Sequence, residues 1–123
     1  MKKIYKSKVF HGNKDGSKIS YPTANLDPSV LPESLKRGVY AGWVEVGDRV
    51  LPGAIYFGPR LVKGEDKDIL EIYILDFSAE IYGEEISFIL EDHIRDVMDF
   101  TDFSLLKDQI EKDIKKIKQV LNV

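Results

Sequence analysis

The stretch Val39–Val46, which reads VYAGWVEV, decides the fold class of this chain. Aromatic and β-branched residues dominate it, as is typical of β-strands. Successive side chains of a strand point to opposite faces of the sheet, and here both faces are largely apolar. The stretch therefore predicts a central strand of the sheet.

Similar short segments occur before and after this stretch in the sequence. Turn-forming residues separate them, including Gly47-Asp48, Pro52-Gly53 and Gly58-Pro59. Short strands at this spacing favour an antiparallel barrel or sandwich over alternating βαβ units. The further predicted strands are Ile4–Phe10, Ala54–Phe57, Ile69–Phe77 and Glu85–Glu91.

The period of the apolar residues changes from about Asp102 onward. Apolar side chains then recur every three or four residues, which is one face of a helix, while lysines and acids fill the other face. Ser104 is the expected N-cap. The pattern predicts a C-terminal helix that packs on the barrel and has no chemical role. The apolar face consists of Leu106, Ile110, Ile114, Ile117 and Leu121.

Length and composition indicate the class of protein. A chain of 123 residues fits one domain, taken here as residues 1–123, and buries roughly two-thirds of its surface on folding. It contains no cysteine, which excludes disulfides and thiolate metal sites. A net charge of -3 disfavours nucleic-acid binding. No long apolar run or signal-peptide pattern is present, so we expect a cytoplasmic protein, most simply a monomer, without membrane contact.

Two neighbouring segments near the N-terminus could contact a phosphate-bearing ligand. The first, Val9–Lys18, is a glycine-rich loop whose glycines would let the backbone approach an anion and in which Lys14 or Lys18 would add charge. It matches no established phosphate-loop pattern, and an ordinary glycine-rich hairpin explains it better when it is considered alone.

The second segment is Tyr21-Pro22-Thr23-Ala24-Asn25. Pro22 stiffens it, and Thr23 and Asn25 project from one face if the segment is extended. A hydroxyl and an amide oxygen side by side could form part of a Mg²⁺ shell completed by phosphate and water. The residues alone favour the simpler reading, in which both side chains only satisfy hydrogen bonds of a turn.

Taken in order, these blocks resemble the riboflavin kinase family. Its members carry a glycine-rich loop, a Gly-x-Pro-Thr-Ala-Asn motif and a Gly-[VI]-Tyr-x-Gly-Trp strand. A Glu-x-His strand, an Asp-Phe turn ending in Tyr-Gly, and an Arg-x-x-x-x-Phe segment follow. After the loop, the matching blocks here are Tyr21–Asn25, Gly38–Trp43, Glu71–Leu75, Asp76–Gly83 and Ile94–Phe100, and they cover almost the whole chain.

The resemblance implies a six-stranded antiparallel Greek-key β-barrel with a C-terminal α-helix packed on it. It implies phosphorylation of riboflavin to FMN by ATP with Mg²⁺, with Zn²⁺ or Mn²⁺ as alternative metals. The adenylyltransferase module of bifunctional members does not fit in 123 residues, so FMN is the expected product. The implied roles are a catalytic base at Glu71, metal ligands at Thr23 and Asn25, ATP contacts at Gly12, Lys18, Thr23, Ile74, Asp76 and Tyr82, and flavin contacts at Asn25, Arg95 and Phe100.

Three departures from the family pattern leave an alternative open. Ser20 stands at a usual glycine, Tyr73 at a usual histidine, and Met98-Asp99 where a lysine is common. A non-catalytic relative that binds flavin or nucleotide would also fit these changes. A nucleic-acid-binding barrel is a weaker third interpretation, because no lysine run interleaves with the aromatic residues.

Overall fold

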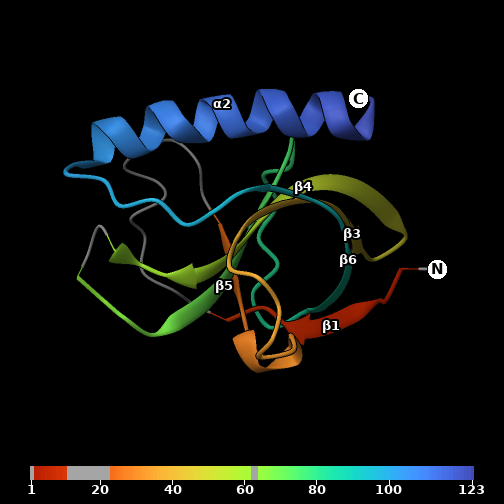
Figure 1. The fold of residues 1–123 in the computed structure, drawn as a ribbon. Coiled ribbons are helices and arrows are strands. Elements are labelled where there is room, and N and C mark those ends of the chain that lie inside the picture. The colour runs from red at the N-terminus through yellow and green to blue at the C-terminus, as the bar shows by residue number, and fades with distance from the viewer. Residues whose placement is uncertain (1, 11–22, 62–63) are drawn as a thin grey trace.

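The computed structural model describes residues 2–10, 23–61 and 64–123. Within these residues the chain forms six β-strands, a short 3₁₀-helix and one long α-helix. Figure 1 shows the helix lying across one side of a strongly curved sheet. The elements are β1 (Tyr5–Lys8), β2 (Ala24–Leu26), η1 (Pro28–Val30), β3 (Gly38–Val46), β4 (Arg49–Pro59), β5 (Asp68–Ile74), β6 (Glu85–Arg95) and α2 (Phe103–Leu121).

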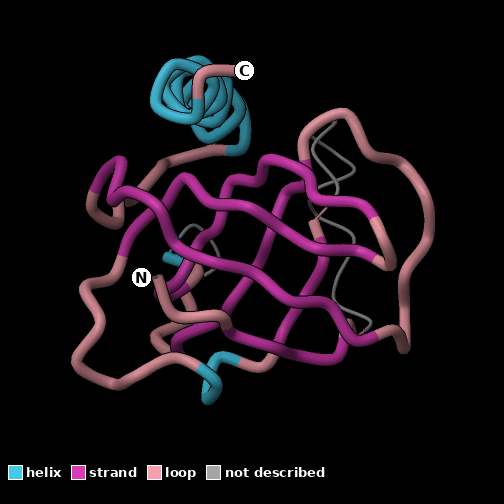
Figure 2. The backbone as a smooth tube through the Cα atoms, turned by 90° about the vertical axis from the view of Figure 1, so that its right-hand side faces the viewer, coloured by secondary structure: helices cyan, strands magenta, loops and turns pink. Residues whose placement is uncertain are grey.

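The six strands form one antiparallel sheet in the spatial order β1-β6-β3-β4-β5-β2. Consecutive strands β3, β4 and β5 form a meander, and β6 returns to pair with β3, which is the Greek-key arrangement. The two edges of the sheet approach each other where Phe10 bridges to Asn25, with the Phe10 amide 2.8 Å from the Asn25 carbonyl oxygen. The sheet is thereby a nearly closed barrel, as the two views show (Figures 1 and 2), and the predicted fold class is confirmed.

β3 is central, as its sequence predicted. Tyr40, Val44 and Val46 point into the main core, whereas Val39 and Ala41 belong to a second cluster under the helix. The main core fills the barrel, and its fully buried side chains include Phe88, Ile55, Leu70, Ile72 and Ile86.

The predicted bounds of several strands were wrong. β1 is shorter than the predicted Ile4–Phe10, and β5 ends at Ile74, three residues before the predicted Phe77. β4 runs through Pro52-Gly53, which the sequence suggested as a turn. Pro52 is tolerated because β5 ends at Ile74, which pairs with Gly53, so no β5 residue faces Pro52 in the ladder. β6 extends to Arg95, four residues beyond its predicted end. β2 was not predicted as a strand, because three residues carry too little periodicity.

Helix α2 packs with its predicted apolar face on β3, β4 and β6. Ile117 is fully buried there against Val39 and Ala41. The predicted N-cap was wrong, because Asp102 has extended backbone angles and its carboxylate accepts a hydrogen bond from the Leu105 amide at 3.0 Å. Ser104 therefore lies within the first turn. Asn122, in the left-handed conformation, ends the helix.

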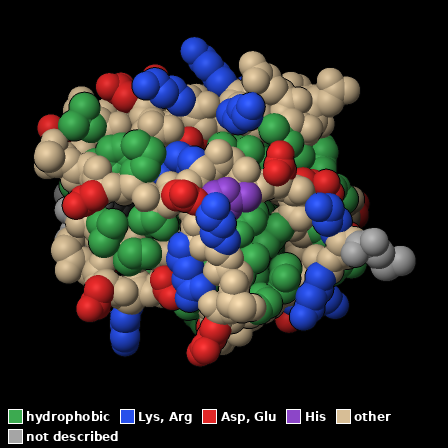
Figure 3. Space-filling model, viewed as in Figure 1, with side chains coloured by type: hydrophobic (Ala, Val, Ile, Leu, Met, Phe, Trp, Pro, Cys, Tyr) green, Lys and Arg blue, Asp and Glu red, His purple; other side chains and the backbone are tan. Residues whose placement is uncertain are grey.

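Charged side chains of both signs are interspersed on the face seen in Figure 3, with apolar areas between them. No helix in the described ranges is long and apolar enough to cross a membrane.

Candidate functional site

A single row of paired residues crosses five neighbouring strands. Asn25 of β2 pairs with Glu71 of β5, Glu71 with Tyr56 of β4, Tyr56 with Val39 of β3, and Val39 with Arg95 of β6. Directly opposed residues share a face of the sheet. The neighbouring residues in the strands, such as Leu70, Ile72 and Ile55, point into the barrel, so this row lies on its outer surface, on the side that carries α2. Three predicted site residues, Asn25, Glu71 and Arg95, thus lie on one surface.

Arg60, a residue that the sequence did not single out, contacts both Asn25 and Glu71. Arg60 Nη2 lies 2.6 Å from Glu71 Oε1 and 3.0 Å from Asn25 Oδ1. The Arg60 and Glu71 side chains are both partly buried, at 17% and 20% exposure. Arg60 gave no sequence signal beyond a basic residue after a Gly-Pro turn. A cation therefore already bridges the oxygen atoms of two predicted site residues.

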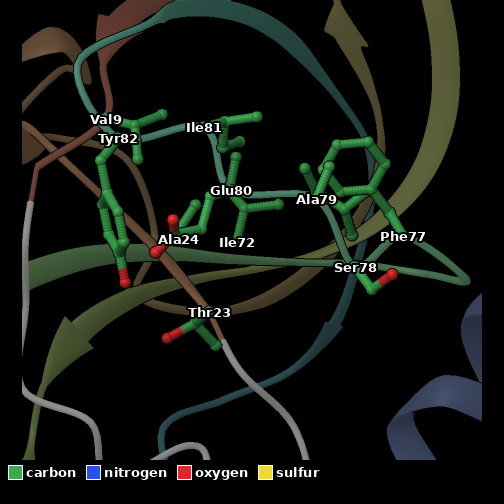
Figure 4. A pocket seen from close by; sticks show the side chains of 11 residues that line it. Val9, Thr23, Ala24, Ile72, Phe77, Ser78, Ala79, Glu80, Ile81 and Tyr82 are labelled. Atoms are coloured by element: carbon green, nitrogen blue, oxygen red, sulfur yellow. The ribbon is translucent and has the colours of Figure 1, made fainter.

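A cleft with a volume of about 140 Å³ is lined by Ala24 and Ile72, the residues next to Asn25 and Glu71 in their strands, but not by Asn25, Glu71 or Arg60 themselves. Three of the predicted ATP contacts, Thr23, Ile74 and Tyr82, are among the residues that line it. Figure 4 shows Tyr82 and Phe77 on opposite sides of the cleft, with Thr23 at its rim. The other lining residues are Val9, Ala24, Ile72, Ser78, Ala79, Glu80 and Ile81. Thr23 connects the cleft to Asn25, which is two residues further along the chain.

The remaining predicted ATP contacts have different outcomes. Asp76 lies in the turn after β5 with a φ of 56°, a left-handed conformation that Asp tolerates better than most residues. It is exposed and is not among the residues lining the cleft, although Phe77 and Ser78 next to it are. Gly12 and Lys18 lie outside the described residues, as does Ser20.

The two predicted flavin contacts lie together at the other end of the row. The Arg95 guanidinium lies over the Phe100 ring, 5.9 Å from its centroid. Arg95 Nε also contacts both carboxylate oxygens of Asp113, at 2.9 and 3.0 Å. Gln109 Nε2 donates a further hydrogen bond to Asp113 Oδ1 at 3.0 Å. Asp113, which the sequence pattern places among the charged residues of the helix, is therefore buried and holds Arg95.

Tyr56 occupies the middle of the row, between Glu71 and Val39. Burial raises the pKa of Tyr56 to about 12, and the negative charges of Glu71 and Asp68 act in the same direction, while Arg95 and Arg60 oppose them. Its hydroxyl donates a hydrogen bond to the Pro59 carbonyl oxygen. Tyr56 is thus a neutral, fixed spacer between the acidic end of the row and the Arg95 end.

The oxygen atoms near Glu71 fit a hard cation. Thr23 offers a hydroxyl, Asn25 an amide oxygen and Glu71 a carboxylate, and the Arg60 guanidinium shows that the last two converge on a cation. No cluster of three or more acidic, histidine or cysteine side chains suited to a metal occurs in the part of the chain that the structure describes. A metal here would therefore need further oxygen ligands from a bound phosphate or from water.

Comparison with known proteins identifies the relatives of this arrangement. The family model described as "Flavokinase: Riboflavin kinase" matches residues 2–121. A bifunctional riboflavin kinase/FMN adenylyltransferase from Haemophilus influenzae is 35% identical over 116 residues, which cover 94% of this chain and 37% of that protein. The enzyme of the same description from Escherichia coli K12 is 37% identical over 109 residues, covering 86% and 34%. The chain spans slightly more than a third of the length of these curated relatives.

Two solved structures share the fold. A structure described as a macrolide-efflux protein from Streptococcus pneumoniae superposes with a TM-score of 0.79 and 31% identity, over 94% of this chain and 38% of that one. Riboflavin kinase from Trypanosoma brucei superposes with a TM-score of 0.69 and 24% identity, over 97% and 76%. A family model that matches nearly every residue of this barrel leads to one conclusion: the chain belongs to the riboflavin kinase (flavokinase) family.

Proposed function

We propose that this chain transfers the γ-phosphoryl group of ATP to the ribityl 5′-hydroxyl of riboflavin, giving FMN and ADP. The observation that carries the proposal is the position of Glu71. It lies opposite Asn25 in the sheet ladder, next in its strand to Ile72, which lines the cleft, and on the same surface as Arg95. A nucleotide in the cleft and a flavin at Arg95 and Phe100 would therefore approach Glu71 from two directions.

The distance between the two ends of the row suits riboflavin, which would lie beside the row because Val39 in its middle is buried under α2. Glu71 and Arg95 are separated by three strand spacings, or about 14 Å at the usual distance between neighbouring strands. An extended riboflavin molecule has a similar length. With its ring system near Arg95 and Phe100, the 5′-hydroxyl of the ribityl chain would reach the region of Glu71. The isoalloxazine ring would also find an aromatic and a guanidinium partner there.

Glu71 has the chemistry of a general base for this hydroxyl. As the 5′-oxygen forms its bond to the γ-phosphorus and the bond to the bridging oxygen of ADP breaks, the hydroxyl proton passes to the Glu71 carboxylate. A positioned base contributes a factor of about 10²–10⁴ to such a reaction. Most of the remaining rate enhancement in phosphoryl transfer comes from alignment and charge neutralisation.

Thr23 and Asn25 would hold a divalent metal that accompanies ATP. Their oxygen donors favour Mg²⁺ or Mn²⁺ over Zn²⁺, which prefers nitrogen and sulfur ligands. The bound metal would supply positive charge to the phosphate oxygens. The apolar walls of the cleft, including Val9, Ile72 and Phe77, suit the base of the nucleotide.

The test is an assay of the purified protein with riboflavin, ATP and Mg²⁺, with FMN detected by chromatography. The wild type should form FMN, and EDTA should abolish it. The Glu71→Gln variant should be at least a hundredfold slower, whereas Glu45→Gln, at an exposed position of β3, should match the wild type. Tight riboflavin binding without FMN would contradict the proposal and favour a non-catalytic relative.

A further inference from the structure

Arg60 stands immediately after β4 in a turn that fixes its backbone. The Arg60 carbonyl oxygen accepts a hydrogen bond from the Glu65 amide at 3.2 Å, and the Leu61 carbonyl oxygen accepts one from the Gly64 amide at 2.9 Å. The guanidinium lies toward β5 and β2, where Nη2 contacts Glu71 and Asn25, and Nη1 lies 4.0 Å from Glu65 Oε2.

We propose that Arg60 is a positioning residue for the phosphoryl-transfer site, which orients the Asn25 amide and the Glu71 carboxylate before substrates bind. The inference rests on the proposed function. It assigns to Arg60 a role in turnover that acts through these two side chains.

The orientation of Asn25 follows from the chemistry of Arg60. An amide side chain can present either its oxygen or its NH₂ group, and the two differ little in shape. A guanidinium nitrogen is only a donor, so the atom that faces Arg60 Nη2 at 3.0 Å must be the amide oxygen. Arg60 therefore fixes which atom of the Asn25 amide lies on the side of Glu71: the oxygen, the one atom of that amide that can bind a cation.

The orientation of Glu71 follows in the same way. The 2.6 Å contact between Arg60 Nη2 and Glu71 Oε1 is a short, charge-assisted hydrogen bond. It occupies one carboxylate oxygen and leaves the second available to accept a proton. Because both side chains are largely withdrawn from water, the pair is screened less than a surface ion pair.

A purely structural ion pair is the competing explanation, and the chain contains a matched example. Arg37 Nη2 lies 2.7 Å from Asp68 Oδ2, and Asp68 pairs with Pro59, the residue before Arg60. Both arginines pair with an acidic residue of β5, but Arg37, which lies just before β3, has no hydrogen bond or ion pair with Asn25 or Glu71 among the described residues. Arg37→Gln is therefore a control that removes the same charge nearby.

The test uses four single variants, Arg60→Gln, Arg60→Lys, Arg37→Gln and Glu71→Gln, and the double variant of Arg60→Gln with Glu71→Gln. The kcat and KM for FMN formation are measured for each, and Mg²⁺–ADP binding is measured by calorimetry. Thermal unfolding shows that each variant is folded at the assay temperature.

We expect Arg60→Gln to lower kcat at least tenfold, with the KM for riboflavin within twofold of the wild type, and to weaken Mg²⁺–ADP binding several-fold. Arg60→Lys, which keeps the charge but not the planar guanidinium, should recover part of both losses. Arg37→Gln should leave kcat and ADP binding within twofold. In the Glu71→Gln background, Arg60→Gln should lower kcat by a smaller factor than in the wild type, because the part of its effect that is transmitted through Glu71 is already lost while the part that acts through Asn25 remains.

Three results would overturn the inference: a normal kcat for Arg60→Gln, an equal loss for Arg37→Gln, or losses that multiply fully in the double variant. Each of these can be seen only if the wild type forms FMN, and then the proposed function stands while the role of Arg60 fails. If the wild type forms no FMN, the proposed function and the proposed role of Arg60 are both refuted.

Discussion

Arg95 of β6 and Asp113 of α2 form a two-oxygen ion pair that fastens the C-terminal helix to the barrel. The side chains are 14% and 6% exposed, so the pair is largely shielded from water. Gln109 and the Asp96 carbonyl oxygen complete the hydrogen bonding around it. The helix is therefore attached next to the predicted flavin contacts by charge as well as by apolar packing.

Removing the charge of Asp113 should destabilise the protein and weaken flavin binding. Asp113→Asn leaves Arg95 buried without a counter-charge, a change that costs about 3 kcal/mol in comparable buried pairs. Arg95 would also lose its fixed orientation over Phe100. Urea unfolding and the quenching of riboflavin fluorescence measure the two effects. Asp108→Asn, on the exposed face of α2, is the control, and an Asp113→Asn protein as stable as this control would contradict the argument.

The N-terminus of α2 gives a direct comparison of two candidate caps. Asp102→Ala removes the acceptor of the Leu105 amide and should lower the free energy of unfolding by about 1 kcal/mol. Ser104→Ala should change it by less than about 0.5 kcal/mol, because Ser104 lies inside the helix. Denaturant unfolding of both variants measures the difference. The reverse order would show that Ser104 is the cap after all.

Gly38 should tolerate no side chain. Its φ is +144°, and a Cβ atom there would lie 2.1 Å from the Arg95 carbonyl oxygen. Backbone strain alone costs about 1–3 kcal/mol, and the clash adds to it and displaces Arg95. Gly47 has a φ of +61° with nothing within 4 Å of such an atom, so Gly47→Ala should cost only about 1 kcal/mol. Thermal unfolding should separate Gly38→Ala from Gly47→Ala, and riboflavin binding should fall only in the former.

Tyr56 should make the stability of the protein sensitive to alkaline pH. Because the folded protein raises the pKa of Tyr56 from 10.0 to about 12, it holds the phenolic proton more tightly than the unfolded chain does. This contribution is fully present below pH about 10 and is lost as the pH rises toward about 12, a change of about 2 kcal/mol. Tyr56→Phe should remove that part of the pH dependence.

The measurement is denaturant unfolding of the wild type and of Tyr56→Phe at a series of pH values. The difference between their unfolding free energies should shrink as tyrosinate forms. A difference that stays constant across this range would refute the assignment of the raised pKa to Tyr56.

The sequence predicted those strands and helices that can be recognised from a pattern in consecutive residues. β3 is a long, two-sided apolar stretch and α2 has a regular helical period, so both were found from neighbouring residues. β2 was missed because three residues have no period, and the extent of β4 was missed because a proline normally interrupts a strand.

The site divides in the same way. The family motifs identified Glu71, Asn25 and Arg95, but these motifs are separate in sequence and could not show that the three residues lie in one row of the sheet. Arg60 and Asp113 act through partners 11 and 18 residues away in sequence, so only the pairing of strands and the packing of the helix reveal them. The wrong N-cap has a similar origin, since Asp102 and Ser104 are both good capping residues and only the backbone angles distinguish them.

The bridge between Phe10 and Asn25 has a dynamic consequence. The barrel closes at this point through a bridge to the three-residue strand β2, and Asn25 is also the predicted ligand of the metal. Short edge strands open locally at a lower free energy than the centre of a sheet. Fluctuations that separate the two edges would thus disassemble the phosphate end of the site while β3, β4 and β6 stay intact. A nucleotide that contacts both Thr23 and Asn25 would hold the two edges of the barrel together. Its binding would slow hydrogen exchange at the Phe10 amide more than at the amides of the core strands.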